Sequence, residues 1–454
     1  MEKSYSGKTL LCRADFAGKE IPGRISFSPE KVAVKLVGFE NFVHLKDGES
    51  VALRLEDNQY CTAKPFATSL GASSSALNIC HYLEFDARQV VIGFRPWVET
   101  DRIKEFYFNL SDTNGLLEAP DIRRAIAASK IGDQPDTRII EASSCGATVS
   151  VSYRYSLDWR DDNYSVSAPH GCVQFEEPKT IDEVSKFVAV LRTFFTMGAA
   201  VEVRTGDYWI VPQNDHDQPL LGGGTARAVF QLIWPSGKAE QVDEDKVHRP
   251  TSVLRCFDKD DRKATSDCLA FWIKNWEAWS PAFSGLFLAT REGNTFDTNR
   301  IVNACKWLEA TPGAEQLKLD NRNELKQIEN AAIEKAHELG LDISRRISGA
   351  IRQLGTESRN QLFERLVDCA VKKDDPCLKK RFLRDLHSAF AIRGSFAHRK
   401  FDHTDDDEFG DYVRSTKAVE ALAFLLLYRR LPLPDGHHWG HGPNNFTEYL
   451  FLPR

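Results

Sequence analysis

The spacing of hydrophobic residues changes near residue 250 and divides the chain into two parts. Up to about residue 250, apolar and polar residues alternate along short segments. Alternation with a period of two is typical of half-buried β-strands. Turn sequences such as Lys46-Asp47-Gly48-Glu49 lie between the segments. Many strands at short spacing predict a β-sandwich or a barrel-like sheet, in one part or two. The clearest strands are predicted at residues 8–16, 32–39, 50–55, 90–94, 103–110, 147–155, 173–176, 201–211 and 228–234.

One helix is predicted inside this β-rich half. Thr180 stands at the capping position, and Asp182 and Glu183 fall in the first turn, where acidic side chains are favourable. Apolar residues then recur at helical spacing, and these are Val184, Phe187, Val188, Val190, Leu191, Phe194 and Phe195.

From about residue 265 the apolar residues follow a helical period almost throughout. Asp297 precedes one such segment, Gly340 ends another, and the last long helix is predicted at about residues 413–428. These segments predict an antiparallel helical bundle, with the aromatic-rich tail from residue 432 packed back on the protein. The predicted fold class is α+β with two domains, a β-rich (sandwich or barrel-like) region at residues 1–250 and an all-α region at residues 255–454.

Composition narrows the class of protein. A chain of 454 residues with 42% hydrophobic residues is expected to form two or three folded domains. A net charge of -6 argues against nucleic-acid binding by the whole surface, so any such site has to be a local basic patch. The ten cysteines include no C-x-x-C pair, so their spacing gives no reason to expect a bound metal, and no cofactor is expected. Scattered cysteines of this kind are typical of buried thiols in a reducing compartment. The longest apolar run, at residues 421–428, is too short for a bilayer, so a cytoplasmic protein is expected.

The candidate chemistry lies in Arg393-Gly394-Ser395-Phe396-Ala397-His398. Histidine can take a proton from a ribose 2′-hydroxyl near neutral pH, and a guanidinium can bind a phosphate and stabilise its charge. Arg381 with His387 and Arg430 with His437 offer similar spacing. Arg381 falls in a basic run expected to be solvated, and His437 follows two prolines and a glycine.

Arg393 continues an apolar stripe. A helix from Leu378 places Phe382, Leu386, Ala389 and Phe390 on one face, and Arg393 lies two turns beyond Leu386. A charge at that position has to be paired, reach water or serve a site. The structural alternative is an arginine that caps the helix or bridges to a neighbouring acid.

Other signals carry less weight. The glycine-rich residues 221–225 have no lysine at the spacing of a phosphate-binding loop. The tryptophans at 272, 276 and 279 follow helical spacing and are expected in the core. A small histidine cluster has no carboxylate or cysteine near it to complete a metal site, and it comprises His437, His438 and His441.

Three segments, in this order along the chain, resemble the HEPN superfamily, in particular ApeA-like abortive-infection proteins. Residues 180–195 are similar to a lone helix inside the family's N-terminal β domain. Residues 298–309, which end in Leu308-Glu309, are similar to the helix that opens its HEPN bundle. Ala391-Ile392-Arg393 through His398 matches its arginine, spacer and histidine, with Gly394 where the superfamily usually has a polar residue.

The resemblance implies an antiviral, metal-independent endoribonuclease that is restrained until infection. Arg393 and His398 would be catalytic, and the RNA ends would be 2′,3′-cyclic phosphates. Independently of the resemblance, the local excess of basic residues around the motif predicts an RNA-binding patch, for which the alternative is a solvated face, and the residues expected to hold RNA are Lys379, Lys380, Arg381, Arg384, Ser395 and Arg399. The resemblance also implies a homodimer or a higher symmetric oligomer through the helical domain, a possible phage-encoded trigger and no membrane partner.

Alternatives stay open. One is a non-catalytic HEPN protein that binds nucleotide, RNA or another protein as a scaffold. Another makes the β-rich region a carbohydrate- or peptide-binding module and the helices a dimerisation device. The β-rich region is expected to be a sensor or regulator. If it recruits RNA instead, basic and aromatic residues should gather on one of its faces.

Overall fold

The computed structural model divides the chain into two compact units. The β-rich unit comprises Met1–Ser111, Ala119–Ala189 and Arg204–Arg249, and the helical unit comprises Asp112–Glu118, Val190–Val203 and Pro250–Arg454. The residues described are 5, 7–16, 19–28, 30–38, 49–75, 78–111, 113, 115–130, 133–158, 163–214, 218–219, 225–226, 228–234, 252–292, 296–318, 322–371, 375–397, 406–434, 444 and 446–451.

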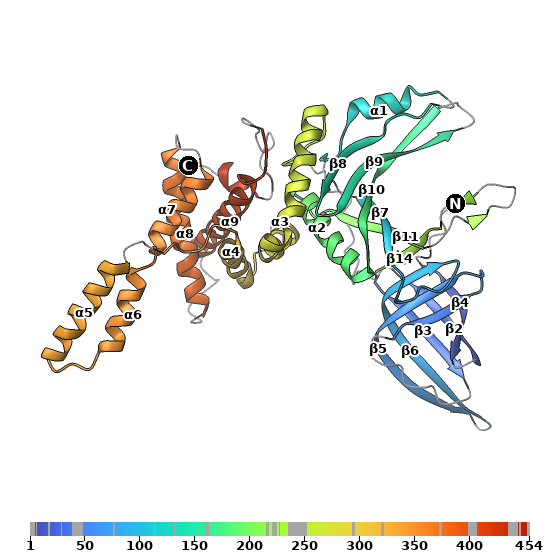
Figure 1. Ribbon diagram of the computed structural model, residues 1–454, viewed down its shortest axis with the longest axis horizontal. Helices are drawn as coiled ribbons and strands as arrows, with labels where there is room; N and C mark the ends of the chain where they lie inside the picture. Colours follow the sequence, from blue (N-terminus) through green and yellow to red (C-terminus); the bar gives the residue numbers. More distant parts are fainter. Residues whose placement is uncertain are drawn as a thin grey trace. The chain divides into compact units, whose positions relative to one another are not determined.

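Six strands of the described chain close into an antiparallel barrel (Figure 1). The neighbours run β3-β2-β1-β4-β5-β6, and β3 also pairs with β6, which closes the sheet on itself. Closure gives these strands partners on both sides, so they present no open edge to other chains. The strands are β1 (Thr9–Phe16), β2 (Lys19–Phe27), β3 (Val32–Gly38), β4 (Val51–Leu55), β5 (Tyr60–Ser75) and β6 (Asn78–Gly93).

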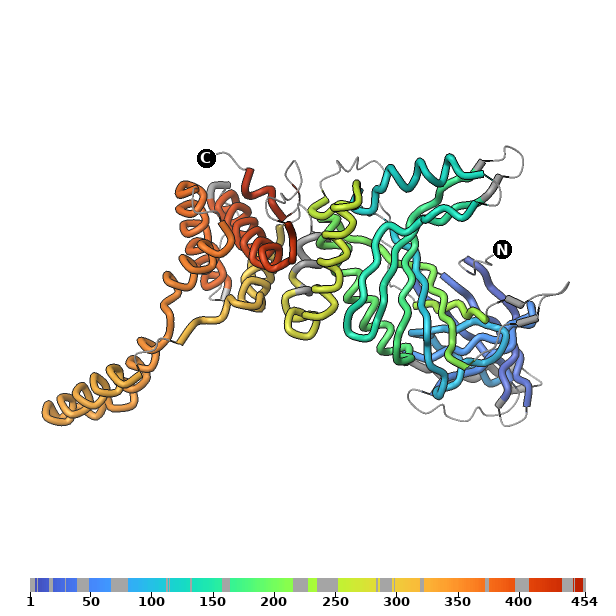
Figure 2. The backbone as a smooth tube through the Cα atoms, turned by 45° about the horizontal axis from the view of Figure 1, so that its top comes forward, coloured from blue at the N-terminus to red at the C-terminus, as the bar shows by residue number. Residues whose placement is uncertain are grey.

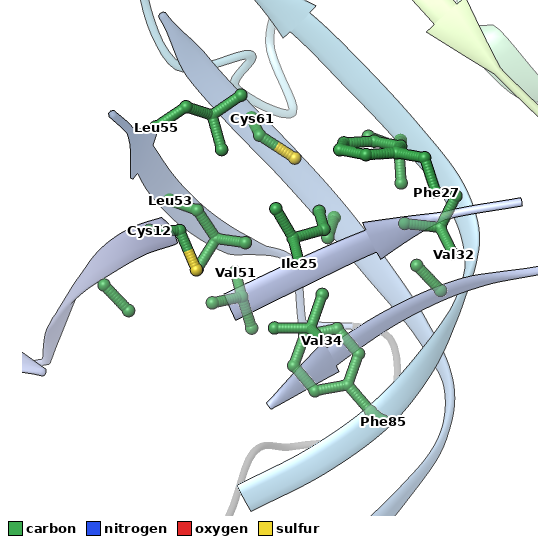
Figure 3. Packing of buried hydrophobic residues seen from close by; sticks show 14 of the residues in the cluster. Cys12, Ile25, Phe27, Val32, Val34, Val51, Leu53, Leu55, Cys61 and Phe85 are labelled. Carbon is green, nitrogen blue, oxygen red and sulfur yellow. The ribbon is translucent and has the colours of Figure 1, made fainter. Parts of the chain in front are cut away.

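The barrel interior is built by alternation. In β4 every second residue is buried, beginning with Val51, and β3 follows the same rule from Val32. Figure 3 shows Ile25, Leu53 and Cys61 pointing toward one another inside the barrel, and each is fully buried. Alternating apolar residues therefore fill the barrel, and the residues between them face outward.

A second set of antiparallel strands continues from the barrel wall. The order runs β6-β14-β11-β7-β10-β9-β8. These strands are β7 (Ile103–Ser111), β8 (Arg138–Ser144), β9 (Ala147–Asp158), β10 (Asn163–Lys179), β11 (Arg204–Pro212) and β14 (Phe230–Ile233), and a separate short pair is formed by β12 (Gln218–Pro219) and β13 (Thr225–Ala226).

Two helices lie between these strands in the sequence. The first is α1 (Pro120–Ala127), where Arg123 stacks over the Tyr153 ring of β9 at 5.0 Å. The second is α2 (Ile181–Ala199), the helix predicted from the sequence. Its cap is confirmed, because the Glu183 amide donates to Thr180 Oγ1 (3.2 Å) and the Thr180 amide donates back to the Glu183 carboxylate (2.8 Å).

The helical unit packs around one buried helix. Helix α9 contacts α4, α7 and α8. The apolar run from Ala421 to Tyr428, which forms the C-terminal part of α9, is buried. Helices α5 and α6 form a hairpin that extends away from these helices (Figures 1 and 2). The elements are α3 (Lys259–Glu292), α4 (Thr298–Ala310), α5 (Arg322–Glu338), α6 (Ser344–Leu354), α7 (Arg359–Ala370), α8 (Pro376–Ala397), α9 (Asp406–Tyr428) and the 3₁₀ turn η1 (Glu448–Phe451).

The α+β class with an N-terminal barrel and a later helical region is confirmed, whereas the HEPN identity of the helices stays a prediction. The tail packs back as expected, with Phe446 stacked on Phe424 at 4.6 Å. Among the described residues, no helix is long and apolar enough to cross a membrane. The prediction of uniformly buried thiols was wrong, because Cys145, Cys369 and Cys377 are exposed on the surface.

Candidate functional site

Arg393 lies where the apolar stripe of α8 meets the surface. Phe382, Leu386 and Ala389 on that stripe are fully buried, as the helical period predicts. The Arg393 side chain, one turn further on, retains 30% exposure. The stripe thus ends in a guanidinium that is half-buried against the bundle and still reaches solvent.

Glu309 holds this guanidinium. Arg393 Nη1 donates to Glu309 Oε1 at 2.5 Å, and Glu309 is the next-to-last residue of α4. Hydrogen bonding to Glu309 raises the pKa of Arg393 above its ordinary value. Cys305, one turn earlier on α4, also lies beside Arg393, and burial raises the pKa of its thiol to about 12. Two of the three segments that carry the family resemblance therefore meet here, in a pair that sequence patterns did not predict.

A small cavity opens beside this pair. Its volume is about 290 Å³. The Phe390 ring lies on its wall, with the Arg359 guanidinium at 5.4 Å and the Arg393 guanidinium at 5.7 Å from the ring centroid. The lining combines α4, α7, α8 and the segment after α4, and comprises Leu308, Glu309, Ala314, Gln316, Arg359, Leu362, Phe363, Leu366 and Phe390.

Helix α8 continues past Arg393 without a break. It extends through Gly394 to Ala397, and Ser395 Oγ donates to the Ala391 carbonyl oxygen at 3.2 Å. Gly394 therefore does not break the helix. His398 and Arg399 lie outside the described residues.

The other residues predicted to bind RNA are spread along α8. Lys379 pairs with Asp368 of α7, Lys380 is exposed, and Arg384 donates to the buried carboxylate of Asp385 at 2.8 Å. Lys379 lies fourteen residues before Arg393, which is about 21 Å along a helix. The two side chains cannot contact the same phosphate, so the structure does not gather the predicted set at one point.

Arg381 is not the solvated side chain that its basic run suggested. Its guanidinium donates to the Tyr449 carbonyl oxygen at 3.0 Å and lies over the Tyr449 ring at 4.8 Å. The expectation was wrong because the returning tail covers this part of α8. His387 stays exposed beside the Phe363 ring, and His437 lies outside the described residues.

Buried charges fix the helices that carry the site. Arg300 of α4 donates from Nε and Nη2 to the two carboxylate oxygens of Glu420 on α9, at 2.9 and 3.0 Å. Asp385 of α8 is fully buried and accepts from Tyr449 Oη at 2.8 Å. Sequence reasoning missed both acids. The available signal was an acid inside an apolar helical run, since a buried carboxylate needs a partner.

Comparisons with protein-family models, with curated proteins and with solved structures find no match for this chain. The resemblance to the HEPN superfamily therefore rests on the sequence segments alone and stays a prediction.

Proposed function

We propose that this chain is a metal-independent HEPN-type endoribonuclease that acts in the cytoplasm in antiviral abortive infection and is restrained until infection. The observation that carries the proposal is the position of Arg393. It is anchored by Glu309 at the end of a buried stripe and retains 30% exposure five residues before His398. A guanidinium has five N–H donors, so the bond to Glu309 leaves capacity for a phosphate.

In the proposed reaction the 2′-oxygen of a ribose attacks the neighbouring phosphorus, and the bond to the 5′-oxygen of the next nucleotide breaks. His398 transfers the proton at the 2′-hydroxyl or at the leaving 5′-oxygen. Arg393 binds the scissile phosphate and stabilises the charge that it gains in the transition state. The products are a 2′,3′-cyclic phosphate and a 5′-hydroxyl.

The site needs two chains. Positions 393 and 398 are about 140° apart on an ideal helix and do not share one face, and α8 continues to Ala397. A symmetric homodimer through the helical unit brings Arg393 of one chain and His398 of its partner together. The β-rich unit then acts as sensor or regulator, with a phage-encoded component as trigger.

Cleavage of total RNA by purified full-length variants in excess chelator tests the chemistry. Arg393→Ala and His398→Ala are each expected to lower the rate by about 10²- to 10⁴-fold. His387→Ala, an exposed histidine of the same helix, and Arg346→Ala, an exposed arginine of α6, serve as matched controls and should retain the activity. Unchanged cleavage in both test variants, or full dependence on Mg²⁺, would contradict the mechanism.

Gly394→Ala separates the dimer site from a local helix break. A Cβ at Gly394 meets nothing within 4 Å, and the substitution should stabilise α8 by roughly 0.5–1 kcal/mol. Cleavage that survives this change supports the composite site. Loss of cleavage, together with a monomer by light scattering, would mean that the helix has to open at Gly394.

The runner-up is a non-catalytic HEPN protein that binds nucleotide or RNA or acts as a scaffold. The ion pair of Arg393 with Glu309 favours it, because it gives the arginine a structural role without any reaction. Under this proposal Arg393→Ala alters stability slightly, and no variant changes RNA cleavage, because none is present to be lost.

A further inference from the structure

A wide pocket lies in the β-rich unit, where the barrel meets the second set of strands. Its volume is about 730 Å³, within the roughly 300–1,000 Å³ typical of small-ligand sites. One wall comes from the barrel strands and the turn after β4, and the other from β7, β9, β11 and β14. All of its lining residues belong to the β-rich unit.

A bulge in β11 builds the second wall. The register of β11 against β7 shifts between Gly206 and Trp209, and Asp207 takes a left-handed backbone conformation with φ of 47°. Asp207 and Trp209 line the pocket. Tyr208 between them packs on Phe106 instead, at 5.6 Å between ring centroids. Bulges commonly redirect side chains in this way beside binding sites.

The lining suits a flat ring with a hydrogen-bonding edge. Trp209 offers an aromatic surface, and the Arg154 guanidinium lies 5.3 Å from its ring centroid. The amides of Asn58, Gln59 and Gln231 line the same pocket and supply hydrogen-bonding groups of the kind that match a nucleobase edge. The Gln59 side-chain oxygen accepts from Tyr5 Oη at 2.7 Å, so this amide offers its N–H donors to a ligand. Asn58, Asp207 and Val229 are exposed, so the pocket is open to a ligand that extends beyond it.

Charge limits the ligand further. Arg154 and Asp207 are the formally charged residues among those that line the pocket, and their charges cancel. A polyphosphate needs more cations than this, whereas one base with one phosphodiester needs a ring surface, amide partners and a single arginine.

We propose that this pocket binds one unstacked nucleotide of single-stranded RNA, with its base on Trp209 and its phosphate at Arg154. The choice of RNA rests on the proposed function. The β-rich unit then holds part of the substrate in addition to its proposed role as sensor or regulator. Aromatic residues and one arginine line this pocket, so its contribution to RNA binding is the hold on a single nucleotide and not a broad basic face.

Binding of short labelled RNA oligomers to the full chain tests this, in a His398→Ala background so that the RNA stays intact. The probes are single-stranded oligo(A), oligo(C), oligo(U) and a guanine-containing oligomer, with a duplex of the same length as control. Trp209→Ala is expected to weaken the best single-stranded probe about 5- to 150-fold, the range for loss of one stacked base. Trp209→Phe, which retains a ring, should recover part of this loss. Phe66→Ala, which removes an aromatic side chain that is 80% exposed on β5, should change nothing.

Arg154→Gln supplies a readout that misfolding cannot imitate. Loss of one phosphate contact lowers the slope of log affinity against log salt by about 0.7 for a single strand. Equal affinity of Trp209→Ala and the parent chain, equal binding of the duplex, or no binding of any single strand would overturn the inference. Cleavage of total RNA that persists in Trp209→Ala beside such a result would leave the proposed ribonuclease standing.

Discussion

The ion pair between α4 and α9 gives the sharpest test of how the bundle is held together. The side chains of Arg300 and Glu420 are only 3% and 4% exposed, and two parallel bonds join them. Arg300 also lies over the Phe296 ring at 4.1 Å. Because α4 carries Glu309 as well, this pair sets the position of the residue that anchors Arg393.

Replacing Glu420 by Ala removes the countercharge of a buried guanidinium. Breaking a buried pair from one side typically costs about 3–5 kcal/mol, because the remaining charge cannot regain its hydration. Replacing both residues by Leu should recover much of this loss, since neither charge then stays in the core. Glu338→Ala is the control. Glu338 pairs with Lys335 on the surface of α5, their side chains are 57% and 68% exposed, and its loss should cost at most about 0.5 kcal/mol.

Hydrogen exchange followed by mass spectrometry localises the effect to the helical unit. Peptides from α4 and α9 in the Glu420→Ala variant are expected to exchange about 150- to 5,000-fold faster through unfolding, which corresponds to the loss in stability. Peptides from the barrel serve as the internal standard. A change below about fivefold, or a double Leu variant as unstable as the single one, would refute the assigned role of the pair.

Two further outcomes follow from buried and exposed groups. Hydrogen bonds from Arg365 hold the pKa of Glu357 below its ordinary value of 4.5. The stability that the ionised Glu357 contributes is therefore complete above pH 4.5 and is lost as the pH falls through the lowered pKa. Glu357→Gln should remove this loss of stability from the acid unfolding curve, and an unchanged curve would contradict the expectation. In the folded chain iodoacetamide should modify Cys145, Cys369 and Cys377, as followed by peptide mapping, and should modify the buried thiols only after unfolding in urea; these buried residues are Cys12, Cys61, Cys256, Cys268 and Cys305. Buried and exposed thiols that react at equal rates in the folded chain would contradict this expectation.

Local periods were enough to predict most strands and helices, because most of these elements have an apolar side. β4 and α8 are clear cases, with alternating burial in one and a continuous buried stripe in the other. β2 was missed, since its first half is largely exposed and contains Pro22 and Gly23. A Cβ at Gly23 would stand 2.5 Å from Leu36 Cδ2, so this glycine permits a close approach of β2 to β3 that no period reveals.

Closure of the barrel and the partners of charged residues depend on contacts between distant positions. The pairing of β3 with β6 joins residues about 50 positions apart, such as Val34 and Phe85. Arg393 and Glu309 are 84 positions apart. A period can place a charge at the end of an apolar stripe, as it did for Arg393, but the acid that meets it depends on how α4 packs against α8. The residues predicted to bind RNA show the same limit of sequence patterns. Their composition grouped them as one basic patch, whereas α8 places them at different points along its length.

The strength of the bond between Arg393 and Glu309 bears on whether it excludes a catalytic role. Both side chains are partly exposed, at 30% and 49%, and ion pairs of this kind are worth about 0–1 kcal/mol. So weak a pair contributes little to the stability of the bundle. A phosphate that accepts two charged bonds from a guanidinium competes well with a single carboxylate contact. The ion pair therefore orients Arg393 and still lets its guanidinium bind another acceptor. Arg300 donates from both Nε and Nη2 to Glu420 in the core, so its guanidinium is not available to a substrate. Between these two arginines, Arg393 is the one that can exchange its carboxylate partner for a substrate.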